Sequence, residues 1–228
     1  MGKKHLGARE KLEKPFYPLQ DGIKKLKDLA YAKFDESVDV SVRLGIDATK
    51  SDQVVRGSVL LPNGNGRIVK VIVFAKGDYA QKATQAGADY VGCEDLIEKI
   101  ESGWLDFNYA VATPDVMGQV GRLAKLLGPK GLLPNKKLGT ITFDTGDIVK
   151  ELKSGRSFFK NDKGGSVHFS IGKRSFDVNK LAENFSAFIK SLVAQRPISA
   201  KGRFLRKVVI SSTMGVGIPI VLDDELKV

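Results

Sequence analysis

Three hydroxyl side chains stand in a row in the segment SSTMG, residues 211–215, and a methionine and a glycine follow them. The β-branched run at 208–210 comes directly before them and predicts a strand. Small hydroxyls donate and accept hydrogen bonds, methionine packs adaptably, and glycine lets a backbone come close to a partner. This strand end therefore suits contact with a large, flat surface, although its methionine is equally typical of a core.

Two other stretches hold groups of the kind that contact a polyanion. In AKFDES, Lys33 and Phe34 follow a predicted helix, where lysine can reach a phosphate and phenylalanine can lie on a ribose or base. In FFKNDKGGSVH, a turn with two glycines precedes a strand and carries Lys163 and His168. The alternatives are ordinary, because an isolated phenylalanine usually packs into a core and most such turns are solvated surface.

The usual signatures of catalysis and metal binding are missing from the sequence. His5, His168 and the single Cys93 form neither an HExxH nor a CxxC pattern, and no serine lies in GxSxG, so we expect no catalytic residue and no metal. The segment GNGRIV precedes its strand instead of following it, and the loop GPKGLLPN lacks the GKS or GKT ending of a phosphate loop. An enzyme that uses a nucleotide is therefore the weaker alternative, and we expect no cofactor.

The charge is strongly basic, with 37 basic and 26 acidic side chains, a net charge of +11 and a pI of about 9.6. This balance indicates a polyanionic partner, nucleic acid before an anionic membrane, with solubility alone as the plain alternative. The basic residues are interspersed with acids, and no helix combines a cationic face with an exposed aromatic face, which disfavours the membrane. The lone cysteine and the charged start MGKKHLGAREKLEK, without the apolar region of a signal peptide, lead us to expect a cytoplasmic protein.

The two ends of the chain predict an α+β arrangement. A loose basic arm leads to a helix capped by Asp21, and then to a strand at 38–46 whose apolar residues alternate with polar ones. We expect this strand to pair antiparallel with a second one at 55–61. Near the other end, the sequence predicts a hairpin with strands at 156–160 and 166–171 around NDKGG, a helix at 177–195 and a closing strand at 203–210.

The middle of the chain has a different pattern of apolar residues. IVKVIVFA, residues 68–75, is apolar on both faces, which is typical of a strand covered by helices in a parallel sheet. Predicted helices then alternate with predicted strands at 89–91, 109–112 and 140–143, and Thr113 and Pro114 mark the start of a helix that runs to 127. We expect about four parallel strands.

The predicted architecture is thus a two-domain α+β protein. A discontinuous, sandwich-like α+β domain comprises residues 1–65 and 157–228, and a Rossmann-like α/β domain is inserted at 66–156. Residues 1–65 carry 12 basic and 9 acidic side chains, residues 157–228 carry 12 and 6, and residues 66–156 carry 13 and 11. Because the excess of positive charge belongs to the discontinuous domain, we expect a polyanion to dock there.

Long stretches of the chain resemble one family closely. They include LAYAKFDESVDVSVRLGID, RGSVLLPNG, ATPDVMGQVGRLAKLLGPKGLLPN, GTITFD, FKNDKGGSVHFSIGK and SSTMG, in that order, and they cover nearly everything beyond the arm. The sequence is similar to large-subunit ribosomal protein one of bacteria, the protein of the mobile stalk beside the tRNA exit site. The resemblance implies a discontinuous RNA-binding domain with a Rossmann-like insertion, in agreement with the division read from the residues.

The resemblance also implies partners and sites. The partners are large-subunit ribosomal RNA, deacylated tRNA in the exit site and the messenger RNA of the protein's own operon, with no membrane and a monomer when free. Ser37 stands where the family commonly has threonine, which keeps the hydroxyl and loses a methyl group. The implied RNA-binding residues are Lys33, Phe34, Ser37, Lys163, His168, Ser211, Thr213, Met214 and Gly215, and Lys130, Lys136 and Lys137 form a possible contact with tRNA or with the facing domain.

Overall fold

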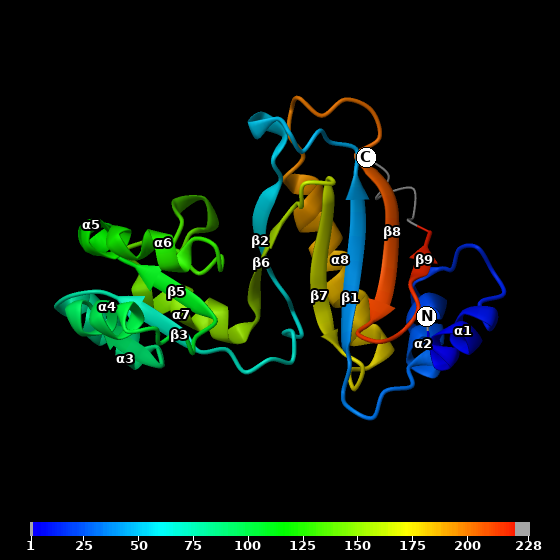
Figure 1. The fold of residues 1–228 in the computed structure, drawn as a ribbon, viewed down its shortest axis with the longest axis horizontal. Coiled ribbons are helices and arrows are strands. Elements are labelled where there is room, and N and C mark those ends of the chain that lie inside the picture. The colour runs from blue at the N-terminus through cyan, green and yellow to red at the C-terminus, as the bar shows by residue number, and fades with distance from the viewer. Residues whose placement is uncertain (1, 222–228) are drawn as a thin grey trace. The chain divides into compact units, whose positions relative to one another are not determined.

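The computed structural model describes residues 2–221, and they fold into two compact units (Figure 1). The outer unit combines Met1–Gly66 with Ser157–Val228, and the inserted unit is Arg67–Arg156. In the described part of the chain, no helix is both long and apolar enough to cross a membrane.

The outer unit contains a four-stranded antiparallel sheet in the order β7-β1-β8-β9 and a two-stranded sheet of β2 and β6. Figure 1 shows β7, β1 and β8 side by side with α8 behind them. The elements of this unit are α1 (Lys3–Glu10), α2 (Leu19–Leu29), β1 (Ser37–Leu44), the 3-10 turn η1 (Ser51–Gln53), β2 (Arg56–Leu60), β6 (Arg156–Lys160), β7 (Ser166–Lys173), α8 (Val178–Ala194), β8 (Leu205–Ser212) and β9 (Ile218–Ile220).

The core of the outer unit lies between one face of the four-stranded sheet and helices α2 and α8. Val38, Val40 and Val42 of β1 are completely buried, and the residues between them lie on the opposite, polar face. Phe188 of α8 stacks on Phe169 of β7 with 4.4 Å between the ring centroids. The period-two pattern therefore determined which face of β1 is buried, and the predicted α+β class is confirmed.

Two predicted strand pairings in the outer unit are wrong. β1 does not pair with β2, because its two edges are occupied by β7 and β8, which come from the far end of the chain. The predicted hairpin of β6 and β7 is reduced to a single bridge between Asn161 and Val167, and β6 pairs with β2 instead. Alternation reports which face of a strand is buried, whereas its partners are set by long-range packing that no local pattern encodes.

The ends of the outer unit also differ from expectation. The arm is not loose throughout, since Lys3–Glu10 form a helix whose Ala8 is buried against the core. Helix α2 begins at Leu19 after Pro18, so that Asp21 lies in its first turn and does not cap it. The closing strand β8 extends to Ser212, and a further strand, β9, was not predicted, because its central proline disfavours that reading.

The inserted unit is built on a three-stranded parallel sheet in the order β4-β3-β5. The predicted fourth strand is only a parallel bridge between Ala112 and Ile141. The elements are β3 (Val71–Phe74), α3 (Asp78–Gln85), β4 (Tyr90–Gly92), α4 (Glu94–Glu101), β5 (Tyr109–Ala112), η2 (Pro114–Val116), α5 (Met117–Val120), η3 (Gly121–Leu123), α6 (Ala124–Leu127), η4 (Lys136–Leu138) and α7 (Thr145–Ser154).

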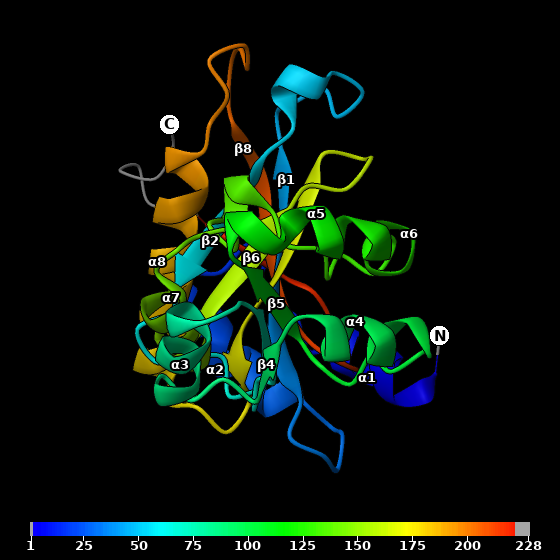
Figure 2. The same ribbon diagram turned by 90° about the vertical axis from the view of Figure 1, so that its left-hand side faces the viewer.

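Helices cover both faces of the parallel sheet. Ile72 and Phe74 of β3 pack with α4, α5 and α6, and the alternate residues Val71 and Val73 are therefore directed toward α3 and α7. Figure 2 shows α3 and α7 on one side of these strands and α4, α5 and α6 on the other.

The single helix predicted from Pro114 to residue 127 is broken into short α and 3-10 pieces. Two glycines, Gly118 and Gly121, explain the break because glycine weakens a helix interior by about 1 kcal/mol relative to alanine. Thr113 does occupy the N-cap position before Pro114, but its side chain makes no capping hydrogen bond.

Candidate nucleic-acid interface

The face of the four-stranded sheet that lies opposite α2 and α8 is rich in hydroxyl and charged side chains. Residues directly opposite in an antiparallel pair share a face, so the register defines this set. Asp39 lies between Ser170 and Ser211, Ser41 is opposite His168, and the remaining pairs follow the same order. The polar face consists of Ser37, Asp39, Ser41 and Arg43 from β1, Ser166, His168, Ser170 and Lys173 from β7, and Lys207 and Ser211 from β8, with the apolar Val209 among them. The ammonium group of Lys173 donates to the Ser37 hydroxyl at 3.1 Å.

One end of the polar face is closed by a turn formed by residues 212–215. The hydroxyl oxygen of Thr213 accepts a hydrogen bond of 3.0 Å from the backbone N–H of Ser37. The hydroxyl of Tyr31 donates to the carbonyl oxygen of Met214 at 2.5 Å, and the N–H of Gly215 donates to the carbonyl of Ser212 at 3.1 Å. Two segments more than 170 residues apart in the sequence are thereby held in one local structure.

Glu36 is central to this arrangement and was missed by the sequence analysis. It is completely buried, its Oε1 accepts a 3.0 Å hydrogen bond from the N–H of Met214, and its Oε2 has no hydrogen-bond partner in the described part of the chain. The sequence does indicate that Glu36 is buried. In a strand every second residue lies on the same face, and Glu36, Val38 and Val40 follow one another at this spacing, so Glu36 falls on the buried face. An acidic residue at a buried position is uncommon and usually has a specific partner.

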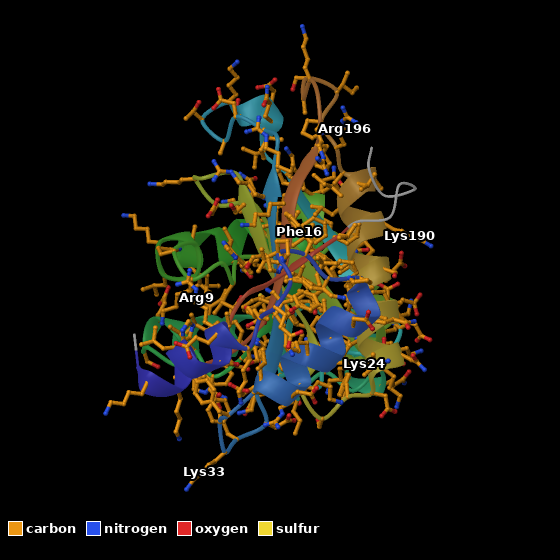
Figure 3. All side chains as sticks on the ribbon, turned by 90° about the vertical axis from the view of Figure 1, so that its right-hand side faces the viewer. Arg9, Phe16, Lys24, Lys33, Lys190 and Arg196 are labelled. Atoms are coloured by element: carbon orange, nitrogen blue, oxygen red, sulfur yellow. The ribbon has the colours of Figure 1, made fainter. Side chains whose placement is uncertain are left out.

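Several side chains beside the turn remain exposed. Phe34 keeps 55% of its surface exposed and Met214 keeps 51%, so that neither belongs to the core. Lys33 lies in the loop after α2, and Figure 3 shows its side chain extending away from the ribbon. Large exposed apolar groups next to hydroxyls and a lysine offer both stacking and phosphate contacts.

His168 lies within the polar face, whereas Lys163 lies beyond its far end. The His168 ring approaches the Ser41 hydroxyl at 3.0 Å through Nδ1 and the Asp162 carboxylate at 3.7 Å through Nε2. Lys163 is exposed in the turn that precedes β7, and the eight residues of β1, about 26 Å of strand, separate this end from the Thr213 end. The predicted site residues therefore form a cluster at 33–37 and 211–215, one central histidine and one distant lysine.

The turn that carries Lys163 is ordered by Asp162. Its Oδ1 accepts a hydrogen bond of 2.7 Å from the N–H of Ser166. This backbone hydrogen bond, helped by a second from Gly164 and by His168, holds the pKa of Asp162 below its ordinary value of 3.8. The same carboxylate therefore orders the start of β7 and faces the ring of His168.

The three lysines singled out in the middle of the chain lie in the inserted unit. Lys130, Lys136 and Lys137 are all exposed, the first in the turn after α6 and the others in η4. The side chain of Asn135 accepts a hydrogen bond of 2.8 Å from the N–H of Lys137, and the N–H of Asn135 donates to the Thr140 hydroxyl at 2.7 Å. The loop is thus ordered around Asn135 and presents its cations to solvent.

The rest of the polar face was also not singled out from the sequence. Ser41 and Arg43 were recognised only as polar positions of a strand, and Ser170 and Lys207 only as members of predicted strands. Their shared face depends on pairings between β1, β7 and β8 that the sequence did not reveal. Arg43 and Lys207 are opposite one another and exposed, which makes this end of the face basic.

The family comparison agrees with this arrangement. Residues 26–216 match the model of the Ribosomal protein L1p/L10e family, a span that includes all of the inserted unit and most of the outer unit. The family resemblance read from the sequence is confirmed. Proteins of this family are generally not enzymes. The chain belongs to the Ribosomal protein L1p/L10e family, as a structural protein of the large ribosomal subunit that binds ribosomal RNA.

Proposed function

We propose that the outer unit grips a structured region of large-subunit ribosomal RNA through the polar face and the adjoining turn at 212–215. The observation that carries this proposal is the set of hydrogen bonds joining Ser37 to Thr213 and Glu36 to Met214. These bonds bring together the two segments whose residue types had suggested contact with RNA. The contact residues we propose are Lys33, Phe34, Ser37, His168, Ser211, Thr213, Met214 and Gly215, with Lys163 as a peripheral contact.

The chemistry of this surface fits the shallow minor groove of an RNA helix. That groove displays ribose hydroxyls and base edges, which are both donors and acceptors of hydrogen bonds. Serine and threonine hydroxyls can take either role, and the half-exposed Met214 and Phe34 can pack on a ribose or base. Lys33 and the basic end at Arg43 and Lys207 supply phosphate contacts that position the RNA without reading its sequence.

The hydrogen bonds of the turn favour binding by preorganisation. Because Thr213 is already tied to Ser37, the first residue of β1, and Met214 to Glu36 just before it, little conformational entropy remains to be lost when RNA docks. We therefore assign the specificity for RNA to the shape of the end of the polar face that carries Ser37 and the turn at 212–215. The salt-dependent part of the affinity is assigned to the surrounding cations.

We further propose that the protein helps deacylated tRNA to leave the exit site and represses translation of its own operon's messenger RNA. A messenger segment that reproduces the ribosomal RNA shape would fit the same polar face, and binding there would compete with the ribosome. For tRNA, the exposed Lys130, Lys136 and Lys137 offer a second basic surface on the inserted unit. The role we propose is structural and regulatory, with a free protein that is a monomer.

The test is a filter-binding titration against large-subunit ribosomal RNA and a scrambled RNA of equal length, at low and high salt. We expect tight binding to the ribosomal RNA that largely survives high salt, and weak, salt-sensitive binding to the scrambled RNA. Equal binding to both RNAs that collapses with salt would show only the non-specific attraction of a +11 protein and would overturn the proposed site.

A further inference from the structure

The inserted unit has a hollow at the point where ligands bind in open parallel sheets. From β3 the chain passes through α3 to β4 on one side, and from β4 it crosses back through α4 to β5 on the other side of β3. The segments that leave β3 and β5 therefore diverge to opposite faces of the sheet and leave a crevice at the carboxyl ends of these strands. A hollow of about 350 Å³ lies there, which is the size of a small-ligand site.

One hydroxyl group that lines the hollow has no hydrogen-bond partner in the described part of the chain. Thr113, the residue directly after β5, is 1% exposed and lines the hollow, and its hydroxyl makes no hydrogen bond among the residues that the structure describes. The hydroxyl oxygen is not among the fully enclosed, unpartnered side-chain atoms of the described residues, so it retains access to the hollow. A ligand in the hollow would provide the missing hydrogen bond.

One wall of the hollow favours an anion. Lys76 and Arg122 both line it, and Arg122 makes no ion pair or side-chain hydrogen bond within the described residues. Helix α3 begins at Asp78 without a side-chain cap, after Gly77 with a positive φ of 59°, so that the first backbone N–H groups of the helix are available. The carboxylate of Asp78 lies in the same first turn, where it weakens the positive electrostatic field of the helix N-terminus without cancelling it.

A network of side chains fixes the position of the lysine. The ammonium group of Lys76 lies 3.1 Å from Glu94 Oε1, to which the side-chain amide of Gln119 also donates at 3.3 Å. The thiol of Cys93 in turn donates to the amide oxygen of Gln119 at 2.9 Å. The hydrogen bond that Lys76 donates to Glu94 raises the pKa of Lys76, which stays protonated at the edge of the hollow.

The remaining lining groups suit a sugar and a flat ring. Asp115 is exposed in the hollow, where its carboxylate can accept hydrogen bonds from vicinal ribose hydroxyls. Tyr79 is half-buried and lines the hollow. Its ring lies 5.5 Å from that of Phe143 and has the Lys82 ammonium group 5.8 Å from its centroid, so a base would stack on the part of the ring that these neighbours leave free. The small volume and the lack of a glycine-rich loop exclude a dinucleotide.

We propose that this hollow, at the carboxyl ends of β3 and β5, binds one nucleoside monophosphate unit. Arg122, Lys76 and the N-terminus of α3 hold the phosphate, Thr113 and Asp115 hold the ribose, and Tyr79 stacks on the base. The unit has two possible sources, a free mononucleotide or a nucleotide within a single strand of RNA. The proposal does not depend on the polar face of the outer unit.

The experiment is an NMR titration of the full-length protein with AMP, with a single-stranded RNA hexamer and with inorganic phosphate as separate arms. We expect AMP to shift the backbone amides of Lys76, Tyr79 and Asp115 saturably below about 10 mM. If the hexamer shifts these amides and AMP does not, the unit is taken from an RNA strand. If neither does so, or if phosphate alone reproduces the effect of AMP, the proposal is overturned.

Three variants complete the test. Arg122→Gln removes the unpaired cation and Thr113→Val removes the hydroxyl at nearly constant shape, and each should weaken AMP binding by about ten-fold or more. Lys125→Gln removes an exposed cation from α6 that does not line the hollow, and it should change the affinity by less than about two-fold. Full AMP affinity in a folded Arg122→Gln protein would contradict the proposal, whereas its affinity for ribosomal RNA is expected to be unchanged.

Discussion

The backbone N–H of Met214 donates a 3.0 Å hydrogen bond to Oε1 of Glu36, a carboxylate with no exposed surface. This bond fixes the only backbone donor of Met214 and joins the loop after α2 to the turn after β8. The neighbouring bond from the Ser37 N–H to the Thr213 hydroxyl runs in the opposite direction along the chain. The turn is therefore shaped by a buried group that is out of reach of any partner at the surface.

Replacing Glu36 with alanine should therefore loosen the turn. The Met214 N–H would lose its acceptor, which we expect to cost about 1–3 kcal/mol of folding free energy and about ten-fold or more in RNA affinity. Glu36→Gln keeps an acceptor oxygen in place and should lie between alanine and the wild type in both urea unfolding and filter binding.

Asp28→Ala, at an exposed position on α2, is the control for Glu36 and should leave both measurements unchanged. If Glu36→Ala is destabilised but binds RNA as tightly as the wild type, Glu36 supports the fold alone and has no role in positioning the turn.

The close approach of Gly215 to Ser212 leads to a second prediction. A Cβ atom on Gly215 would lie 2.3 Å from the Ser212 hydroxyl oxygen and 3.4 Å from its Cβ. Because Ser212 is buried, Gly215→Ala should displace the turn and weaken RNA binding. Ser212→Ala removes the clashing oxygen, so the double variant should recover most of the affinity.

A double-mutant cycle of filter-binding affinities checks this coupling. Additive losses from the two changes would show that the contact between Gly215 and Ser212 does not limit the shape of the turn.

Met214 provides a third prediction, because it is half-exposed and its replacement leaves the core intact. Met214→Asp introduces a negative charge where we place RNA, and the affinity for ribosomal RNA should fall by about ten-fold or more. Leu60→Asp is a matched control, since Leu60 on β2 is 52% exposed and lies outside the polar face. Equal losses of affinity in the two variants would remove the turn from the RNA-binding site.

These predictions depend on features that the sequence revealed unequally. The hydroxyls of SSTMG and the pair Lys33 and Phe34 were recognisable because residue type alone suggests their chemistry. The role of Glu36 was not, because its acceptor function exists only once residues 36 and 214 meet. Period-two alternation identified the buried face of β1 in the same way, but not its partners β7 and β8, which chain folding brings from more than 120 residues away.

In the inserted unit the sequence predicted the type of each secondary-structure element better than it predicted where the element begins and ends. The apolar run at 68–75 correctly predicted a buried parallel strand, but β3 is restricted to Val71–Phe74 and Ile68 is fully exposed. Hydrophobicity cannot separate a strand from the linker that leads into it, since both can be apolar.

Asp162 should make the start of β7 sensitive to acid. The hydrogen bond from the Ser166 N–H lowers the pKa of Asp162, so its contribution to stability is complete above the ordinary value of 3.8 and is lost as the pH falls through the lowered value. The amide resonance of Ser166 in the folded protein should therefore shift with a midpoint below pH 3.8 in NMR spectra. Asp162→Asn should abolish this transition, and a transition that persists in the variant would assign it to another group.

The outer unit should fold and bind RNA without the inserted unit. The side-chain amide of Asn65 lies 3.3 Å from the hydroxyl of Ser157, so the two points where the chain leaves and re-enters the outer unit are close together. A short glycine-serine linker can therefore replace 67–156 without straining the outer unit. The shortened protein retains the polar face, the turn at 212–215 and most of the excess positive charge, so its affinity for ribosomal RNA should stay within about ten-fold of the wild type.

Circular dichroism establishes whether the shortened protein folds, and filter binding measures its affinity. If it folds but no longer binds, the inserted unit supplies RNA contacts that the polar face lacks, and the proposed site is incomplete.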